Sequence, residues 1–315
     1  MLNLGTTKLE IAPLALGGNV FGWTADEAAS FAVLDAFIDR GYNLIDTADV
    51  YSRWFPGHVG GESETILGKW FAQGGGRRTK VVLATKVGME MGEGKKGLSA
   101  RYIRSSVEDS LRRLQTEYID LYQSHTDDAQ TPLEETLQVY DELVNSGKVR
   151  YIGASNYKGS RLRQAIETSR HEDLVAYKTL QPNYNLHTRA EYENDLAPVV
   201  AEYKLAVLPY FALGSGFLTG KYKTKEDAAG AKREGMVGKY FDARGEKILS
   251  ALAAVSKESG EAQASIALAW LLTRPNIAAP IASATSVKQL EALVRGAEMK
   301  LSAEQVKTLD EASAY

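Results

Sequence analysis

The chain has 315 residues, of which 44% are hydrophobic and 24% are charged, a balance that is typical of globular proteins and excludes a disordered or fibrous chain. A formal net charge of -3 without long basic runs gives no reason to expect nucleic acid as a partner, and the absence of cysteine excludes disulfides and thiol catalysis. The first residues lack a signal-peptide pattern and no apolar run is long enough to span a bilayer, so we expect a cytoplasmic protein with no membrane contact.

The N-terminal residues predict a β-hairpin with its turn at residues 5–8. Beyond it, short apolar runs alternate with segments whose apolar residues recur at helical spacing. The runs predict strands at 13–18, 43–46, 80–86, 118–125, 149–156, 175–181, 205–210 and 277–282. The predicted helices are at 31–38, 62–71, 99–114, 131–144, 162–166, 248–255, 287–295 and 302–312. Ser99 is expected to cap one helix, and Ser302 with Gln305 forms a capping box for the last.

Eight strands alternating with helices, with no linker or low-complexity tract between them, predict an α/β fold: a (β/α)8 TIM barrel with an N-terminal β-hairpin and an extra C-terminal helix. We expect one domain that covers residues 1–315. The segment 211–244 is longer than most loops in compact domains, which indicates a functional loop.

Polar and ionisable residues lie where the predicted strands end, which is the face of this barrel that carries active sites. These residues are Asn19, Asp46, Lys86, His125, Asn156, Gln181, Tyr210 and Ser283. Tyr51 follows Asp46 by five residues, so a phenol and a carboxylate are expected to face the same cavity. The opposite face carries no comparable set, and the reaction centre is therefore expected at the carboxyl ends of the strands.

Asp46, Tyr51 and Lys86 together suit proton donation. Tyrosine has a pKa of about 10 in water, so donation at neutral pH needs a neighbouring cation that stabilises the phenolate. Lys86, held by Asp46, would supply that charge. A proton-donating tyrosine beside a carbonyl oxygen suits reduction of C=O, in which negative charge develops on the oxygen. A structural buried ion pair is the alternative interpretation of Asp46 and Lys86.

Hydride for such a reduction cannot come from a side chain, which implies a nicotinamide cofactor. Ser155, Asn156 and Gln181 offer the hydroxyl and amide groups that a carboxamide requires. Tyr210 is placed to stack on the nicotinamide ring.

Together these segments resemble the aldo-keto reductase family, from the hairpin to the final helix. The family's catalytic tetrad is matched, in order and context, by Asp46, Tyr51, Lys86 and His125. Residues 153–156 and 180–185 are similar to its carboxamide-binding motifs, and 208–221 resembles the segment that stacks on nicotinamide and wraps the pyrophosphate. The resemblance implies an NADPH-dependent oxidoreductase that reduces aldehydes or ketones to alcohols, with Tyr51 as the proton donor.

The resemblance also implies a set of cofactor contacts. They come from Gly18, Asn19, Asp46, Ser155, Asn156, Gln181, Tyr210, Phe211, Leu213, Gly214, Ser215, Gly216, Lys221, Arg233, Ser283, Thr285 and Gln289. The chain departs from the family where Phe211-Ala212 replaces a usual Ser-Pro pair, and where the segment 283–289 lacks arginine. Recognition of a 2'-phosphate would then rest on Ser283, Thr285 and Gln289, with Lys288 as a further candidate, and without a bidentate clamp. NADPH is the expected cofactor, and NADH stays an alternative.

Trp23, Trp54 and Phe55 lie on the loops after the first two strands and are expected to wall the substrate pocket, with a plain surface position as the alternative. Apolar walls suit aldehydes or ketones with carbocyclic or aryl bodies. Asp127 and Asp128 near the histidine strand are a poor set of metal ligands, so no metal site is expected.

Other functions stay open on the sequence alone. Lys86 would suit a Schiff-base lyase, although an amine paired with a carboxylate stays protonated and is a poor nucleophile. A cofactor-sensing regulatory subunit with little turnover, as some relatives in the family are, is a further alternative. So is an enzyme whose net reaction is oxidation of secondary alcohols with NADP. The sequence leaves both monomer and homodimer open.

Overall fold

The computed structural model describes residues 1–230 and 234–315, and in this part of the chain it confirms the predicted (β/α)8 barrel. Eight parallel strands form one sheet in the order β10-β3-β4-β5-β6-β7-β8-β9. Their bounds are β3 (Ala15–Gly17), β4 (Leu44–Asp46), β5 (Val82–Val87), β6 (Ile119–Ser124), β7 (Val149–Ser155), β8 (Thr179–Gln181), β9 (Ala206–Val207) and β10 (Ile281–Ala282). A parallel bridge joins Val207 of β9 to Ile277, which precedes β10, and the Ile281 N–H of β10 donates to the Pro209 carbonyl at 2.9 Å, so the barrel closes.

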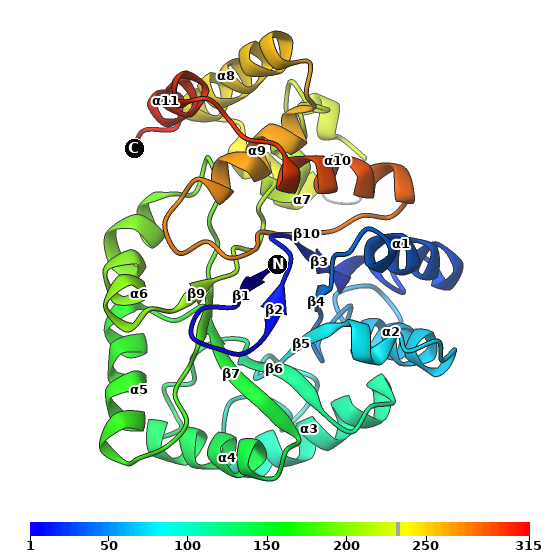
Figure 1. The fold of residues 1–315 in the computed structure, drawn as a ribbon, viewed down its shortest axis with the longest axis vertical. Coiled ribbons are helices and arrows are strands. Elements are labelled where there is room, and N and C mark those ends of the chain that lie inside the picture. Colours follow the sequence, from blue (N-terminus) through cyan, green and yellow to red (C-terminus); the bar gives the residue numbers. More distant parts are fainter. Residues whose placement is uncertain (231–233) are drawn as a thin grey trace.

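Helices surround the sheet on its outer side, as Figure 1 shows. In the described residues they are α1 (Glu27–Asp39), α2 (Glu62–Ala72), α3 (Ala100–Leu114), α4 (Leu133–Asn145), α5 (Gly159–His171), α6 (Ala197–Tyr203), α7 (Glu234–Val237), α8 (Ala243–Ser259), α9 (Gln263–Leu272), α10 (Val287–Glu298) and α11 (Ala303–Ala312). Two predicted helix starts are confirmed, because Ser99 accepts a hydrogen bond from the Tyr102 N–H and Ser302 forms the capping box with Gln305.

Among the described residues, the sequence prediction missed the short helices α6 and α7 and also α9, the helix that packs between α8 and α10. Eight of its ten residues are buried. A helix that is buried on nearly all sides has no polar face, so its sequence shows no helical periodicity.

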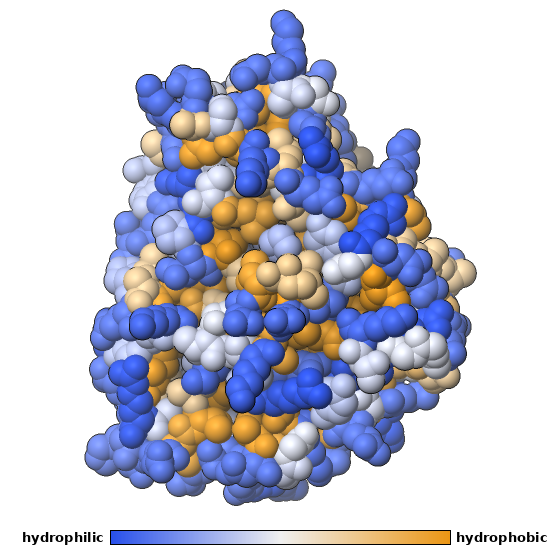
Figure 2. All heavy atoms as spheres, in the orientation of Figure 1, coloured by the Kyte–Doolittle hydropathy of each residue, from blue (hydrophilic) through white to orange (hydrophobic). Residues whose placement is uncertain are grey.

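The predicted N-terminal hairpin is also confirmed, with β1 (Leu2–Asn3) antiparallel to β2 (Glu10–Ile11). Leu4, Leu9 and Ile11 pack into the apolar interior of the barrel, and Figure 1 shows the hairpin in front of the barrel's centre. The same face in the space-filling view is mostly hydrophilic, with smaller hydrophobic areas between (Figure 2). The hairpin therefore closes the amino-terminal end of the barrel and leaves the carboxyl ends of the strands for the site. No helix among the described residues is both long and apolar enough to cross a membrane.

Inside the barrel, polar side chains lie above an apolar layer. Leu44, Ala84 and Leu121 belong to the apolar interior. Because side chains of a strand alternate between its two faces, the residues two positions later also point inward. These are Asp46, Lys86 and Gln123, which are 2%, 0% and 0% exposed.

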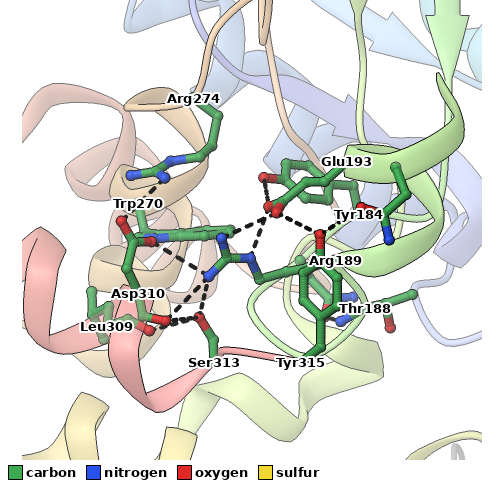
Figure 3. A network of polar contacts seen from close by, with 12 residues as sticks. Tyr184, Thr188, Arg189, Glu193, Trp270, Arg274, Leu309, Asp310, Ser313 and Tyr315 are labelled. Atoms are coloured by element: carbon green, nitrogen blue, oxygen red, sulfur yellow. Dashed lines mark hydrogen bonds and ion pairs between the residues drawn. The ribbon is translucent and has the colours of Figure 1, made fainter. Parts of the chain in front are cut away.

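The last helix is anchored by Arg189, which follows β8 in the chain (Figure 3). Its guanidinium donates to Ser313 Oγ at 2.8 Å and to Glu193 Oε1 at 2.8 Å, and it lies over the Trp270 ring at 5.3 Å. The Trp270 Nε1–H in turn donates to Asp310 Oδ1 of α11 at 2.8 Å. The extra C-terminal helix is thus joined to α9 and to the loop that follows β8.

Candidate active site

Lys86 is the centre of the site. Its Nζ donates to Asp46 Oδ2 at 2.6 Å, to the Thr47 carbonyl at 2.8 Å and to the Tyr51 phenol oxygen at 3.0 Å. All three ammonium hydrogens are used and the side chain is closed to solvent, so Lys86 is fixed in place. β4 and β5 are neighbours in the sheet, which is why the strand ends bring Asp46 and Lys86 together.

The charges of these groups depend on one another. Burial opposes the charge of Lys86, but Asp46 and Tyr51 outweigh it, and the pKa of the Lys86 ammonium is raised above its usual value. Burial also raises the pKa of Tyr51, while Lys86 works in the opposite direction. Lys86 lowers the pKa of the Tyr51 phenol, as expected from the sequence. The pKa is nevertheless raised overall, because burial has the larger effect. Tyr51 is protonated at neutral pH, and the protonated Lys86 is a poor nucleophile for a Schiff base.

His125, at the end of β6, lies against the tyrosine, with 5.8 Å between the two ring centroids and an edge-to-face arrangement. Burial, followed by the charge of Lys86, lowers the pKa of His125 well below its usual value, so the imidazole is neutral. His125 Nδ1 is buried and has no hydrogen-bond partner in the described residues. A neutral imidazole has one N–H group, which can donate a hydrogen bond to an oxygen bound beside the phenol.

Two glutamines hold the other oxygen of Asp46. Gln181 Nε2 donates to Asp46 Oδ1 at 2.9 Å and Gln123 Nε2 donates to it at 3.2 Å. Gln181 was among the predicted site residues, whereas Gln123 was missed. Its signal in the sequence is a polar residue at an inward position, two residues after Leu121 on β6.

The other residues predicted to bind a carboxamide lie beside this group. Ser155 Oγ donates to the Gln181 carbonyl at 2.8 Å, and Asn156 Nδ2 donates to the His125 carbonyl at 2.8 Å. Tyr210 donates its hydroxyl hydrogen to Asn156 Oδ1 at 2.7 Å. Asn156 has a left-handed backbone, with φ 56°, which turns its amide back toward the strand ends. The structure thus gathers all of the predicted carboxamide residues around the tetrad.

A turn rich in left-handed residues follows β9. Gly214, Ser215 and Gly216 have φ values of 54°, 58° and 102°. Successive backbone N–H groups in such a turn form a concave site for anions. Ser215 Oγ is buried, with the residue 4% exposed, and has no hydrogen-bond partner in the described chain. The Lys221 side chain lies close to Gly216, where a Cβ would be 3.3 Å from Lys221 Cε. The N–H groups of Gly214 and Gly216 donate to the Phe211 and Leu213 carbonyls, at 2.7 Å and 2.9 Å. The unpartnered Ser215 hydroxyl and the Lys221 cation beside this turn fit the phosphates of a dinucleotide.

Ser283 and Asn19 meet across the strand ends of β10 and β3, where Ser283 Oγ donates to Asn19 Oδ1 at 2.6 Å. Gly17 makes room for this contact, because a Cβ there would be 2.6 Å from Ser283 Oγ. Further out, Gln289 Oε1 accepts from the Thr285 N–H at 3.0 Å and from its hydroxyl at 3.2 Å. The predicted contacts of the adenosine phosphate therefore lie at the start of α10. Arg233, another predicted cofactor residue, lies outside the described residues.

Gly18 and the two hydrophobic cofactor candidates complete the predicted set. Ser63 Oγ donates to the Gly18 carbonyl at 2.7 Å, which fixes the backbone after β3. Phe211 has a left-handed backbone with φ 51°, and Leu213 packs partly buried against the core.

Aromatic residues form one wall beside Tyr51. The Trp54 ring lies 5.6 Å from Tyr51 and 5.6 Å from Trp23, edge-on in both cases. Trp54 and Phe55 are 45% and 42% exposed, and Phe55 packs against His58 at 4.9 Å. Trp54 therefore lies directly beside the phenol, and Trp23 packs against Trp54.

The acidic residues near His125 bind other protein groups. Asp127 accepts from Arg161 Nε at 3.0 Å, and Asp128 accepts from the Leu98 N–H at 2.8 Å. Among the described residues, no group of three or more histidine, aspartate or glutamate side chains is arranged to bind a metal ion.

Comparison with known proteins gives consistent matches along the chain. The model of the Aldo/keto reductase family matches residues 13–314. The "Uncharacterized oxidoreductase YrpG" of Bacillus subtilis is 37% identical over 98% of this chain and 94% of its own length. The "Aldo-keto reductase YhdN" of the same organism is 34% identical, over 91% of this chain and 84% of its own. A protein of Oryza sativa subsp. japonica named "Probable voltage-gated potassium channel subunit beta" is 31% identical, over 91% of this chain and 88% of its own.

Proposed function

Because the chain belongs to the aldo-keto reductase family of oxidoreductases, we propose that it reduces aldehydes or ketones to alcohols with NADPH, and that Tyr51 donates the proton. The observation that carries this proposal is the contact between the buried Lys86 ammonium and the Tyr51 phenol, 3.0 Å apart. The reaction moves hydride to the carbonyl carbon while the carbonyl oxygen takes up a proton.

Each residue of the tetrad has a defined part in the proposed reaction. Tyr51 is protonated at neutral pH and gives its proton to the oxygen as negative charge develops there. Lys86 stabilises the phenolate that remains, and Asp46 keeps the lysine charged and oriented. Neutral His125 lies beside the phenol, where it binds and orients the substrate oxygen. Trp54 and Trp23 wall the space and favour substrates with apolar bodies.

The cofactor, when bound, would supply the hydride. Gln181, Ser155 and Asn156 would hold its carboxamide, and Tyr210 would stack on the ring. Gly214 to Gly216 and Lys221 would hold the diphosphate. Ser283, Thr285 and Gln289 would meet a 2'-phosphate through neutral groups, so we expect only a modest preference for NADPH over NADH.

A regulatory role is the second candidate, favoured by the similarity to the rice protein named as a potassium channel subunit β. In that case, cofactor binding rather than turnover would be the output. The complete tetrad supports turnover instead, since a binding protein needs no proton donor paired with a buried lysine.

The test is a panel of aldehydes, ketones and secondary alcohols, followed by the absorbance of the reduced nicotinamide with NADPH and with NADH. We expect turnover of apolar aldehydes or ketones, and its loss in Tyr51→Phe. If cofactor binds but no carbonyl or alcohol in the panel turns over, the regulatory role replaces the enzymatic one.

A further inference from the structure

Asp46 Oδ1 accepts two amide hydrogen bonds, from Gln181 Nε2 at 2.9 Å and from Gln123 Nε2 at 3.2 Å. The two glutamines are 2% and 0% exposed. Lys86 occupies the other carboxylate oxygen of Asp46 at 2.6 Å. Both oxygens of this carboxylate are therefore bound by donors on three different strands, β5, β6 and β8.

Charge determines which way each amide faces. A carboxylate paired with an ammonium only accepts hydrogen bonds, so each glutamine must turn its NH2 group, and not its oxygen, toward Asp46. This places Gln123 Oε1 on the side of Gln181, where it accepts the second hydrogen of Gln181 Nε2 at 3.3 Å. Both amide hydrogens of Gln181 are then used.

Gln181 has only its oxygen left for a ligand. Gln181 Oε1 accepts no hydrogen bond within the described part of the chain. The atom is not fully buried, so a ligand can reach it. A group that binds there must donate a hydrogen.

We propose that Gln123 is a positioning residue that fixes the Gln181 amide as an acceptor, so that the site selects a cofactor whose carboxamide carries an NH2 group. This rests on the proposed use of a nicotinamide cofactor. Without Gln123, the second N–H of Gln181 would lose its partner, and the amide would have one anchor at Asp46 in place of two. The same contact joins the carboxamide end of the cofactor site to the carboxylate that holds Lys86.

A glycine on the intervening strand gives these side chains room to meet. Gln123, Gly153 and Thr179 are paired in register across β6, β7 and β8. A Cβ at Gly153 would be 2.2 Å from Thr179 Oγ1 and 3.1 Å from Gln123 Cγ. The backbone of Gly153 does not have the left-handed conformation that favours glycine, so space rather than conformation explains the residue. Any larger residue at this position would clash with the Thr179 hydroxyl and crowd Gln123.

The test compares binding of NADP+ with that of its 3-acetylpyridine analogue, in which a methyl group replaces the carboxamide NH2. Affinity is measured by quenching of tryptophan fluorescence, since Trp23 and Trp54 are near Tyr51. If NADP+ does not bind, the NAD+ pair is used. In the wild type we expect the carboxamide cofactor to bind about tenfold more tightly, the usual scale of one hydrogen bond.

Gln123→Met keeps the shape of the side chain and removes its hydrogen bonds, so we expect discrimination between the two cofactors to fall to about twofold. Gln181→Met should remove it fully, and the double variant should equal Gln181→Met, because Gln123 acts through Gln181. Thr179→Val is the matched control, since Thr179 is also fully buried beside Gly153 but its hydroxyl has no partner among the described residues. Its discrimination should equal that of the wild type.

Undiminished discrimination in a folded Gln123→Met variant would overturn the inference, as would equal affinity for both cofactors in the wild type. If Gln123→Met does not fold, Gln123→Leu, which also lacks the amide, is measured instead, and undiminished discrimination there has the same meaning. Failure of the proposed function looks different: either neither NADP+ nor NAD+ binds to the wild type, or a cofactor binds and no carbonyl or alcohol turns over while the discrimination between the two cofactors is still measured.

Discussion

The ammonium nitrogen of Lys86 lies 3.0 Å from the phenol oxygen of Tyr51, and the lysine side chain is closed to solvent. In these surroundings water does little to screen the charge. Burial raises the pKa of Tyr51 and Lys86 works against the rise. The proposed chemistry depends on this balance, since the same phenol must donate a proton in reduction and accept one in oxidation.

Replacing Lys86 with methionine should move the pH dependence of alcohol oxidation to higher pH. Oxidation needs the phenolate of Tyr51 as a base, and loss of the Lys86 charge leaves burial unopposed, so the pKa of Tyr51 rises further. We expect turnover near neutral pH to fall by about two orders of magnitude or more. Lys86→Arg keeps the charge and should show a smaller displacement. A pH–rate profile of Lys86→Met that coincides with the wild type would remove Lys86 from the mechanism.

The buried Asp49 carboxyl is expected to make the free energy of unfolding depend on pH. It is 1% exposed, and neither of its carboxylate oxygens has a hydrogen-bond partner in the described residues. Burial and the neighbouring Glu64 raise the pKa of Asp49 well above its usual value. A raised folded pKa destabilises the protein as pH rises above the unfolded pKa of about 4, and the loss levels off above the folded pKa. Asp49→Asn should therefore raise the free energy of unfolding near neutral pH by at least about 1 kcal/mol.

The measurement is urea unfolding of Asp49→Asn and wild type near neutral pH and near pH 4, and the stabilisation should shrink at the lower pH. Asp128→Asn is the control of opposite sign. Burial opposes ionisation of Asp128, but hydrogen bonds from Leu98 and Thr131 outweigh it and lower the pKa of this carboxyl. That variant should be less stable than the wild type near neutral pH. Destabilisation by Asp49→Asn near neutral pH would show that Asp49 is ionised and paired.

The loop after β8 contacts the long segment 211–244 near both of its ends. Asn185 Nδ2 donates to the Phe211 carbonyl at 3.0 Å, and His187 Nε2 lies 3.1 Å from Asp242 Oδ1. The same loop continues into Arg189, which joins it to α11 (Figure 3). The two ends of the segment are thus fixed to the barrel, and closure over a cofactor would take place between them.

Lys221→Ala should weaken cofactor binding and alter its kinetics. We expect wild-type binding to occur in two phases, with a slow closing step that this variant removes or accelerates. Stopped-flow tryptophan fluorescence measures both the phases and the affinity. Lys223→Ala, two residues further in the same segment, is the matched control and should behave as the wild type. Single-phase binding at every concentration, with unchanged affinity in Lys221→Ala, would show that the segment does not close over the diphosphate.

Gln289→Arg should increase the preference for NADPH over NADH. Gln289 now meets Thr285 through a neutral amide oxygen. A guanidinium at the start of α10 would pair with a 2'-phosphate in a bidentate way, and we expect the ratio of the two affinities to rise by about tenfold. Gln289→Met removes the same amide without adding charge and should not increase the ratio. Tighter binding of NADH than NADPH by the native protein would contradict the assignment of this end of the site.

The sequence predicted the barrel well because each strand candidate is a short apolar run with a polar residue at its end. It was weaker on element bounds. The sixth strand was expected from Val175, but β8 begins at Thr179, because Val175 instead donates its N–H to Asp141 Oδ1 at 3.0 Å. Similarly, α4 begins at Leu133 with Pro132 as its N-cap, while the Thr131 hydroxyl donates to Asp128 at 2.7 Å.

The candidate site could be predicted from the sequence only where the type and position of a single residue indicate its chemistry. An ionisable group at a strand end, such as Lys86, is conspicuous in a sequence. Gln123 is not, because its position matters only through the register of β6, β7 and β8 and the space left by Gly153. Such spatial relations join residues that are far apart in the chain, so the residue pattern within one segment does not reveal them.

The central claim, that Tyr51 is the proton donor, is tested most directly by the turnover of Tyr51→Phe on a carbonyl substrate, with cofactor affinity measured on the same preparation. The variant loses only the hydroxyl, and Lys86 keeps its contacts with Asp46 and the Thr47 carbonyl. We predict turnover lower by about two to four orders of magnitude, with cofactor binding retained. Turnover near that of the wild type, with cofactor bound, would contradict the account.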